Sequence, residues 1–184
     1  MNINIFDIFP VIRLDNDIVL RKIVTELDYL DYFNFITKPE VSKYLSIDDL
    51  PLSPEAAKIE LDYWAKIFDR RAGFYWAIAI ESSNKLIGTC GFNYWNKSHR
   101  RAEISYDLNS DYWGRGISSK AVEAVINFAA QEMQIQRIKA TVANDNISSI
   151  RVLEKNVFKR EGCLDKYGIL HDRTVDFYMY ARCW

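Results

Sequence analysis

The sequence predicts a mixed α/β fold, in which a central sheet carries helices on both faces. Three observations support this fold class. Strand and helix patterns alternate along the chain, three strand patterns follow one another in its middle, and only 7 Gly and 4 Pro leave little room for linkers. At roughly 150 residues per domain, a chain of 184 residues favours one domain. We therefore predict one domain over residues 1–184, with residues 1–17 as an N-terminal extension.

The first third of the chain predicts one strand and two helices. The run from Ile18 to Ile23 is rich in β-branched residues, which favours a strand. Thr25 is a candidate N-cap for a helix that extends to about Thr37 and ends before Pro39. A second helix is predicted over residues 53–71. Its first residues, Ser-Pro-Glu, place a cap, a first-turn proline and an acid at the positive end of the helix dipole.

The middle of the chain predicts an antiparallel meander of three strands. Residues 74–81 and 86–94 are aromatic and β-branched, and a Ser-Ser-Asn-Lys turn joins them. Residues 102–108 alternate between two faces, since successive side chains of a strand point in opposite directions. One face carries Ala102, Ile104, Tyr106 and Leu108, and the other carries Glu103, Ser105 and Asp107.

The last part of the chain predicts two further helices and three further strands. A loop over residues 109–118 leads into a helix with one apolar stripe, formed by Ile117, Ala121, Val122, Val125, Phe128 and Ala129. After a strand at 137–142, the turn 144–146 starts a shorter helix whose buried side carries Ile150, Leu153 and Val157. The final strands are expected around 159–163 and 174–182, with Gly168 in the bend between them.

Composition and charge exclude several classes of protein. The formal net charge is −1, which argues against a protein held to nucleic acid by bulk positive charge. No apolar run approaches the ~20 residues needed to cross a bilayer, and residues 1–10 lack the basic start of a signal peptide. The three cysteines form no CxxC pair, and two histidines are too few for a metal site. We expect a cytoplasmic protein with free thiols and without a metal.

The loop before the longer of the two later helices is a candidate anion site. A strand, a short loop with Gly114 and Gly116, and a helix N-terminus present unpaired backbone N–H groups at the positive end of a helix dipole. The loop lacks the Gly-Lys-Ser/Thr of a phosphate-binding P-loop. It also has Ser119 where a dinucleotide fingerprint needs Gly or Ala. On its own, the pair of glycines is equally typical of an ordinary strand-to-helix turn.

Three blocks resemble the GCN5-related N-acetyltransferase (GNAT) family, in its RimJ/RimL-like branch. Trp113-Gly114-Arg115-Gly116-Ile117-Ser118 is similar to the family's acetyl-CoA loop, with Trp and Ser in place of the usual first and last residues. Residues 144–162 are similar to the branch's N-x-x-S-x-x-V-L-E-K-x-G-F-x-x-E-G, with Val157 in place of Gly. Residues 38–45 are similar to its D-P-E-V-x-x-Y-L. The resemblance covers about residues 18–184.

The resemblance implies a fold and a cofactor site. The GNAT fold has a mixed, mostly antiparallel sheet of about seven strands, helices on both faces and a V-shaped splay between the two middle strands. Acetyl-CoA would be the co-substrate, with its pyrophosphate on the loop amides and its pantetheine arm along the strand before the loop. The implied cofactor-binding residues are Tyr106, Asp107, Leu108, Trp113, Gly114, Arg115, Gly116, Ile117, Ser118, Ser119, Asn146 and Ser149. Asn146 is also a natural helix N-cap, and Arg115 is equally typical of a solvated charge.

The resemblance also suggests catalytic residues. Many family members place a Tyr acid in the last helix, where this chain has Leu153. Ser149, one turn earlier, is the candidate proton donor, and a surface serine is the plain alternative. Glu103 is the candidate base, because it is a polar residue in a largely apolar strand; a partner for Arg100 or Arg101 is its alternative role. The oxyanion would meet a backbone N–H near Leu108.

The expected reaction is direct attack of an amine on the acetyl thioester in a ternary complex. The branch favours the α-amine of a protein N-terminus as acceptor. A polyamine or aminoglycoside acetyltransferase is the alternative, as is a CoA-binding module without catalysis. We expect acetyl-CoA and an amine as partners, with no nucleic acid and no membrane, and a homodimer stays open. Residues 1–70 have a net charge of −5 and residues 71–184 of +4, which suggests an acidic acceptor side and a basic cofactor side.

Overall fold

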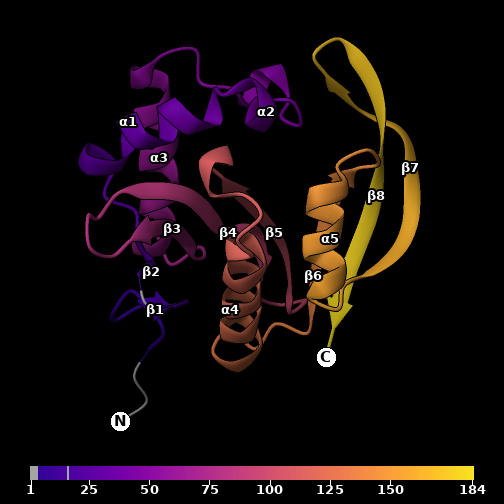
Figure 1. Ribbon diagram of the computed structural model, residues 1–184. Helices are drawn as coiled ribbons and strands as arrows, with labels where there is room; N and C mark the ends of the chain where they lie inside the picture. Colours follow the sequence, from indigo (N-terminus) through magenta and orange to yellow (C-terminus); the bar gives the residue numbers. More distant parts are fainter. Residues whose placement is uncertain (1–3, 16) are drawn as a thin grey trace.

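The structure is a computed structural model that describes residues 4–15 and 17–184. Across these residues the centre is one open sheet with the strand order β1-β2-β3-β4-β5-β6-β8-β7 (Figure 1). Described neighbours pair antiparallel, except for the parallel pair β5–β6. The strands are β1 (Ile12–Arg13), β2 (Ile18–Lys22), β3 (Tyr75–Ile80), β4 (Leu86–Asn96), β5 (Arg101–Leu108), β6 (Arg137–Ala143), β7 (Lys159–Leu170) and β8 (Arg173–Cys183).

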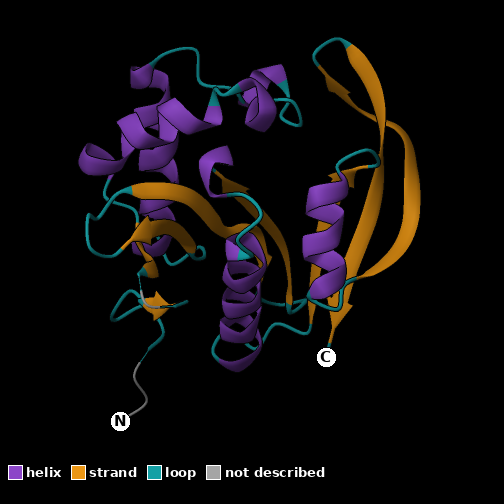
Figure 2. Ribbon diagram, in the orientation of Figure 1, coloured by secondary structure: helices purple, strands orange, loops and turns teal. Residues whose placement is uncertain are grey.

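Helices cover both faces of the sheet, which confirms the predicted mixed α/β fold (Figure 2). One buried apolar cluster joins α4 and α5 to the sheet, and a second joins α1 and α3 to the opposite face. In the described residues no helix is both long enough and apolar enough to cross a membrane. The helices are α1 (Thr25–Ile36), α2 (Pro39–Ser42), α3 (Pro54–Asp69), α4 (Ile117–Gln131) and α5 (Ile147–Lys155), with 3₁₀ turns η1 (Ile47–Asp49) and η2 (Ser110–Tyr112).

The two helices of the first third begin in different ways. α3 begins as predicted, with the Ser53 hydroxyl accepting a hydrogen bond from the Ala56 N–H at 3.2 Å. The prediction that Thr25 caps α1 is wrong, because the N-cap residue is Val24. The Asp28 carboxylate instead accepts the Val24 N–H at 2.8 Å, so the acceptor comes from within the first turn of the helix.

The C-terminal hairpin is longer than predicted. β7 extends to Leu170, so Gly168 lies within this strand and not in the bend. The turn consists of His171 and Asp172, both at positive φ. Val157 is also misplaced by the prediction. It follows α5 and is 64% exposed, whereas Leu153 is buried as predicted.

The segment predicted as an N-terminal extension packs on the sheet. It contributes β1, which the predicted count of about seven strands omits. The rings of Phe6 and Phe9 pack against Phe74 and Trp76, with centroid distances of 5.0 Å for Phe6–Phe74 and 5.7 Å for Phe9–Trp76. The Trp76 indole N–H donates to the Pro10 carbonyl at 2.8 Å. Residues 1–3 and 16 of this predicted extension lie outside the described residues.

The sheet opens between β5 and β6, as the family fold implies. Their parallel pairing, in the described residues, ends at Glu103 and Lys139. β5 continues to Leu108 and β6 to Ala143, and β6 pairs with β8 along its length instead. The ends of β5 and β6 thus form a V whose inner edges carry backbone groups without a strand partner.

Candidate functional site

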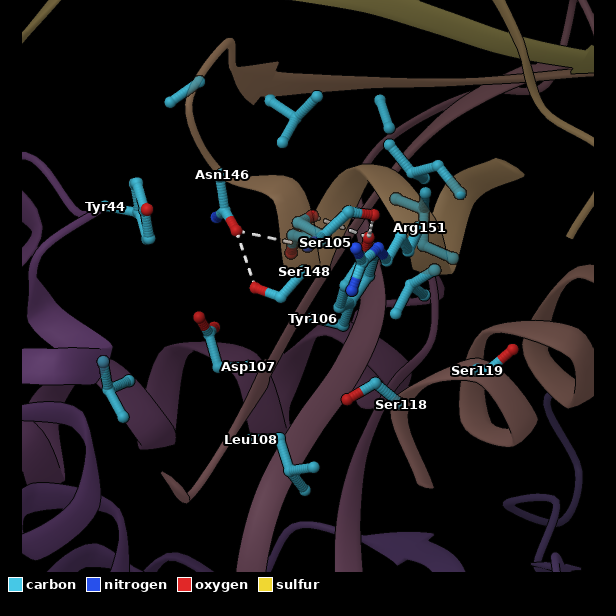
Figure 3. A pocket seen from close by; sticks show the side chains of 18 of the residues that line it. Tyr44, Ser105, Tyr106, Asp107, Leu108, Ser118, Ser119, Asn146, Ser148 and Arg151 are labelled. Atoms are coloured by element: carbon cyan, nitrogen blue, oxygen red, sulfur yellow. Dashed lines mark hydrogen bonds between the residues drawn. The ribbon is translucent and has the colours of Figure 1, made fainter. Parts of the chain in front are cut away.

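A cavity of about 580 Å³ occupies the opening between β5 and β6. Its walls are the open end of β5, the end of β6, the glycine loop with the start of α4, and the first two turns of α5. α2 and the residues that follow it form the side opposite α5. Figure 3 shows Tyr44, Asp107, Leu108, Ser118 and Asn146 around the same open space.

The backbone of β5 points alternate polar groups into this opening. The Asn109 N–H donates to the Ile87 carbonyl of β4 at 2.8 Å. In an antiparallel ladder only every second residue bonds to the same neighbour. The register Leu108–Gly88 and Tyr106–Cys90 therefore places Leu108 and Tyr106 at positions whose N–H and C=O groups face away from β4. β6 has already separated there, so these groups line the V.

The glycine loop supplies a second set of backbone donors. Gly114 and Gly116 both have φ of +74°, in the left-handed region that favours glycine. Within the described chain, the amide N–H groups of residues 114–119 have no hydrogen-bond acceptor, and the first helical bond runs from the Lys120 N–H to the Gly116 carbonyl. These amides lie at the N-terminus of the 15-residue α4. Such an end binds anions through its free donors and the helix dipole.

The side chains of the loop differ in their relation to the cavity. Trp113 lines it, and its indole N–H donates to the Leu108 carbonyl at 2.8 Å, which ties the loop to the end of β5. Arg115 does not line the cavity. Its guanidinium donates to the Asp111 carbonyl at 3.1 Å and lies over the Tyr112 ring, so a phosphate contact by this side chain requires it to turn. The backbone amide of Arg115 remains in the donor set.

A buried asparagine that the sequence reasoning missed fixes the start of α4. Asn156, just after α5, donates through its side-chain amide to the Ser119 carbonyl at 3.2 Å and to the Ser119 hydroxyl at 3.3 Å. It also donates to the Val152 carbonyl at 2.9 Å. Ser119 therefore uses its side chain to hold α4 against α5. The only sequence signal was a polar residue at the end of an amphipathic helix.

Asn146 is the N-cap of α5, as one of its two predicted roles requires, and it also lines the cavity. Its side-chain oxygen accepts the Ser149 N–H at 3.1 Å and the Ser148 hydroxyl at 2.9 Å. Arg151, on the next turn, lines the cavity and adds positive charge on this side. The basic cofactor side suggested by the charge distribution thus contains at least one cavity-lining cation.

Ser149 contacts the strand across the opening. Its hydroxyl lies 2.8 Å from the Tyr106 hydroxyl, which also donates to the Ser149 carbonyl at 3.2 Å. Burial raises the pKa of Tyr106, so its hydroxyl stays protonated and can donate. The pair places two hydroxyl groups on the α5 side of the V.

Glu103 lies at the closed end of the V. Its carboxylate forms an ion pair with the Lys139 ammonium at 2.9 Å, across the last paired position of β5 and β6. It lines the cavity, but its partner is Lys139 and neither of the arginines considered from the sequence. A proton transferred to Glu103 would have to break this ion pair.

Asp107 is a titratable group in the cavity. From the sequence, only its backbone was expected to take part, as a segment of the strand along the pantetheine arm. Strand alternation sends its side chain to the α1–α3 face, together with Ser105, whose hydroxyl lies 2.8 Å from the Tyr75 hydroxyl. Burial, followed by the negative charges of Glu60 and Asp49, raises the pKa of Asp107 to about 7. The signal available in the sequence was a carboxylate on the polar face of β5.

Two contacts close the α2 side of the cavity. The Tyr44 hydroxyl donates to the Asp145 carbonyl at 3.1 Å, which joins the segment after α2 to the turn before α5. His171, in the β7–β8 turn, has its Nε2 3.0 Å from the Ser42 carbonyl. Tyr44 lines the cavity, whereas Trp64 of α3 stacks on Tyr75 with a centroid distance of 4.3 Å.

An open sheet with free strand edges beside an amide-rich loop forms a cavity whose backbone donors suit an extended, partly anionic ligand. The acetyltransferase (GNAT) domain model matches residues 17–159. YoaA of Bacillus subtilis (strain 168), an uncharacterized N-acetyltransferase, is 31% identical over 173 residues, which are 94% of this chain and 96% of that protein. The ribosomal-protein-serine acetyltransferase of Escherichia coli (strain K12) is 34% identical over 110 residues, 60% of this chain and 62% of that protein.

Solved structures share the fold. The acetyltransferase from Salmonella typhimurium that modifies the N-terminal serine of ribosomal protein L7/L12 superposes with a TM-score of 0.83 at 23% identity, covering 95% of this chain and 99% of that chain. RimL, an L7/L12 α-N-protein acetyltransferase in complex with coenzyme A, gives 0.85 at 23% identity, covering 95% and 98%. The chain belongs to the GNAT family and is an N-acetyltransferase.

Proposed function

We propose that this N-acetyltransferase transfers acetyl from acetyl-CoA to the α-amine of a protein or peptide N-terminus, by direct attack in a ternary complex. The observation that carries the proposal is the presence, in one cavity, of two sets of backbone donors: the amides of residues 114–119 in the glycine loop and the open edge of β5. A ligand with a pyrophosphate at one end and an amide-bearing arm at the other is complementary to these two sets. The names of the relatives and neighbours, several of them ribosomal-protein acetyltransferases, favour an N-terminal acceptor.

The cofactor would lie along the V. The amides of residues 114–119 would hold the pyrophosphate, since no protein acceptor in the described chain competes for them. Tyr106 would pair its outward backbone groups with the amides of the pantetheine arm, as an added strand does. Asn146 and Arg151 would contact the arm and the phosphates from the α5 side.

The reacting carbonyl would then lie near the end of β5. The Leu108 N–H, which faces the opening, would donate to the oxyanion that develops on the thioester carbonyl. Ser149 remains the candidate donor to the departing thiolate, with Tyr106 holding its hydroxyl. Glu103, which the sequence suggested as the base, is ion-paired with Lys139 and is assigned no step in this geometry. Most of the rate gain would come from holding amine and thioester in position.

The acceptor would enter from the α1–α3 side. Asp49, Glu60 and Asp107 make that side electronegative, which suits a cationic amine. The same charges favour a polyamine as the second candidate acceptor. A peptide α-amine has a pKa of about 7.7–8.0 and a side-chain amine one near 10.4, so the α-amine is much the easier to deprotonate at pH 7.

An acceptor panel separates the candidates. CoA release is followed with acetyl-CoA and, in turn, a peptide with a free N-terminal serine or alanine, spermidine, and an aminoglycoside. The proposal predicts the highest kcat/KM with the peptide. Turnover confined to spermidine or the aminoglycoside assigns a small-molecule acceptor, and tight CoA binding without any turnover assigns a binding module.

A further inference from the structure

We propose that the side chain of Asp107, and not that of Glu103, accepts the proton that the attacking amine must lose. The proposal rests on the proposed function and deepens it, because it assigns the acid–base group of the same site. Three features support it. The Asp107 carboxylate points into the cavity, it has no hydrogen-bond or ion-pair partner among the described residues, and acidic or neutral groups surround it.

The carboxylate of Asp107 is directed into the cavity. Figure 3 shows it in the open space between Tyr44 and Ser148. Its own residue precedes Leu108, whose backbone N–H faces the V, so proton acceptor and oxyanion donor are adjacent along one strand. Because neighbouring side chains of a strand point to opposite faces, Asp107 approaches from the acceptor side while Tyr106 and Ser149 approach from the cofactor side.

Asp107 is also without a partner. Among the described residues its carboxylate makes no hydrogen bond and no ion pair, whereas Glu103 is bound to Lys139 at 2.9 Å. Glu103 also lies where β5 and β6 still pair, four positions back from the widest part of the opening. An unpaired carboxylate can receive a proton without first breaking an ion pair.

The groups around Asp107 are acidic or neutral. Glu60 on α3 and Asp49 in η1 repel its negative charge, and together with burial they raise the pKa of Asp107 to about 7. The negative charge of Asp107 acts in turn on Tyr32 of α1, Tyr75 of β3, Cys90 of β4 and Tyr106 of β5, and burial, more than that charge, raises the pKa of each. They stay neutral near pH 7, and no lysine or arginine of the described residues counters the effect.

This environment matches the task. An acceptor α-amine has a pKa of about 7.7–8.0, so transfer of its proton to a carboxylate with a pKa of about 7 costs little free energy. The ammonium gives its proton to an Asp107 oxygen, and the freed lone pair attacks the thioester carbonyl carbon. The C–N bond forms and the C–S bond breaks. As the amide forms, the Ser149 hydroxyl donates a proton to the thiolate and takes the second proton of the nitrogen in its place. Asp107 then releases its proton to solvent.

The test compares Asp107→Asn with Glu103→Gln, two isosteric changes that each remove one carboxylate. Wild type is first assayed with peptide, spermidine and aminoglycoside. Failure with the peptide alone overturns the proposed acceptor, and the comparison then proceeds with the amine that is turned over. Failure with every amine overturns both proposals. Binding of acetyl-CoA is measured separately by titration calorimetry.

We expect Asp107→Asn to lower kcat at pH 7 by about 100-fold with acetyl-CoA affinity unchanged, and Glu103→Gln to change kcat by less than about three-fold. The residual rate of Asp107→Asn should rise with pH until the acceptor amine is itself deprotonated. Asp107→Glu, which retains an acid, should restore part of the rate and keep the wild-type ionisation in the pH profile. The proposal is overturned if Asp107→Asn retains kcat, if it raises only KM, or if Glu103→Gln causes the larger loss.

Discussion

Val157 has a left-handed backbone conformation, with φ of +63°, at the end of α5. The Phe158 N–H bonds to the Leu153 carbonyl and the Val157 N–H to the Glu154 carbonyl, each at 3.0 Å. This is the Schellman pattern of a helix C-terminus, in which the left-handed residue is usually glycine. The family block has glycine at this position, and the structure shows the conformational reason.

Val157→Gly should therefore stabilise the protein. A β-branched side chain in the left-handed region costs about 1–2 kcal/mol, and the greater freedom of glycine in the unfolded chain offsets part of that gain. We expect an increase of about 1 kcal/mol in the free energy of unfolding, measured by urea denaturation, with a smaller gain for Val157→Ala. Val157 is 64% exposed, so little packing is lost. An unchanged or lower free energy of unfolding for Val157→Gly would contradict backbone strain at this position.

Ionisation of the Asp107 carboxyl group should lower the free energy of unfolding as the pH rises. Its pKa in the folded state is about 7, well above the ordinary value of 3.8 that applies in the unfolded chain. The folded state therefore holds the proton more tightly, and the penalty for ionising Asp107 grows between about pH 4 and pH 7 and is constant above.

Asp107→Asn removes this penalty. Relative to wild type, we expect the variant to be more stable by about 1–3 kcal/mol at pH 8, with the difference shrinking towards pH 4. Urea unfolding at the two pH values measures it. A difference that grows towards acid pH would mean that the carboxylate is stabilised, and not strained, in the folded protein.

At the scale of elements, the glycine loop and α4 form the proposed phosphate site. A Cβ on Gly116 would meet no protein atom within 4 Å, so the space beside it is open to a ligand, while its φ of +74° disfavours any side chain. Asn156 holds the start of α4 in place through Ser119. The donor set is thus anchored from α5, and not by the loop alone.

Gly116→Val should weaken acetyl-CoA binding by at least about ten-fold, because a branched side chain both strains the loop and fills the approach to the amides. Gly162→Ala is the matched control. A Cβ there also meets nothing within 4 Å, and Gly162 has no positive φ. We expect unchanged affinity in the control. Equal affinities for both variants, by titration calorimetry, would exclude the loop as the phosphate site.

The sequence predicts elements best where local physics decides them. Ser53, with Pro54 behind it, predicts the start of α3, and the alternation of β5 predicts which of its side chains face each side. The sequence does not predict how α1 is capped, because the acceptor for the Val24 N–H is the Asp28 carboxylate in the first turn of the helix. Nor does it predict Gly168 within β7, since pairing with β8 extends that strand.

The candidate site is predicted in outline. The loop glycines, Asn146 and Ser149 do line one cavity, whereas Arg115 turns outward. The ion pair of Glu103 and the raised pKa of Asp107 depend on neighbours distant in sequence, Lys139 for the first and Glu60 for the second. Such pairings follow from the fold and carry no local signal.

At the scale of the whole molecule, the opening between β5 and β6 joins two faces with different chemistry. The proposed cofactor side carries free amides and Arg151, and the proposed acceptor side carries Asp49, Glu60 and Asp107. In the proposed reaction, a thioester on one face would meet an amine from the other face through the V. The near-neutral net charge of −1 conceals this division.

The most direct test uses one pair of peptides. Both carry an internal lysine and begin with serine, and they differ only in that one has a free α-amine and the other a blocked one. With acetyl-CoA, we predict CoA release with the free peptide alone, and a single acetyl group on its N-terminal residue by fragmentation mass spectrometry. Equal CoA release with the blocked peptide, or acetylation of its lysine, would contradict the proposed α-amine acceptor.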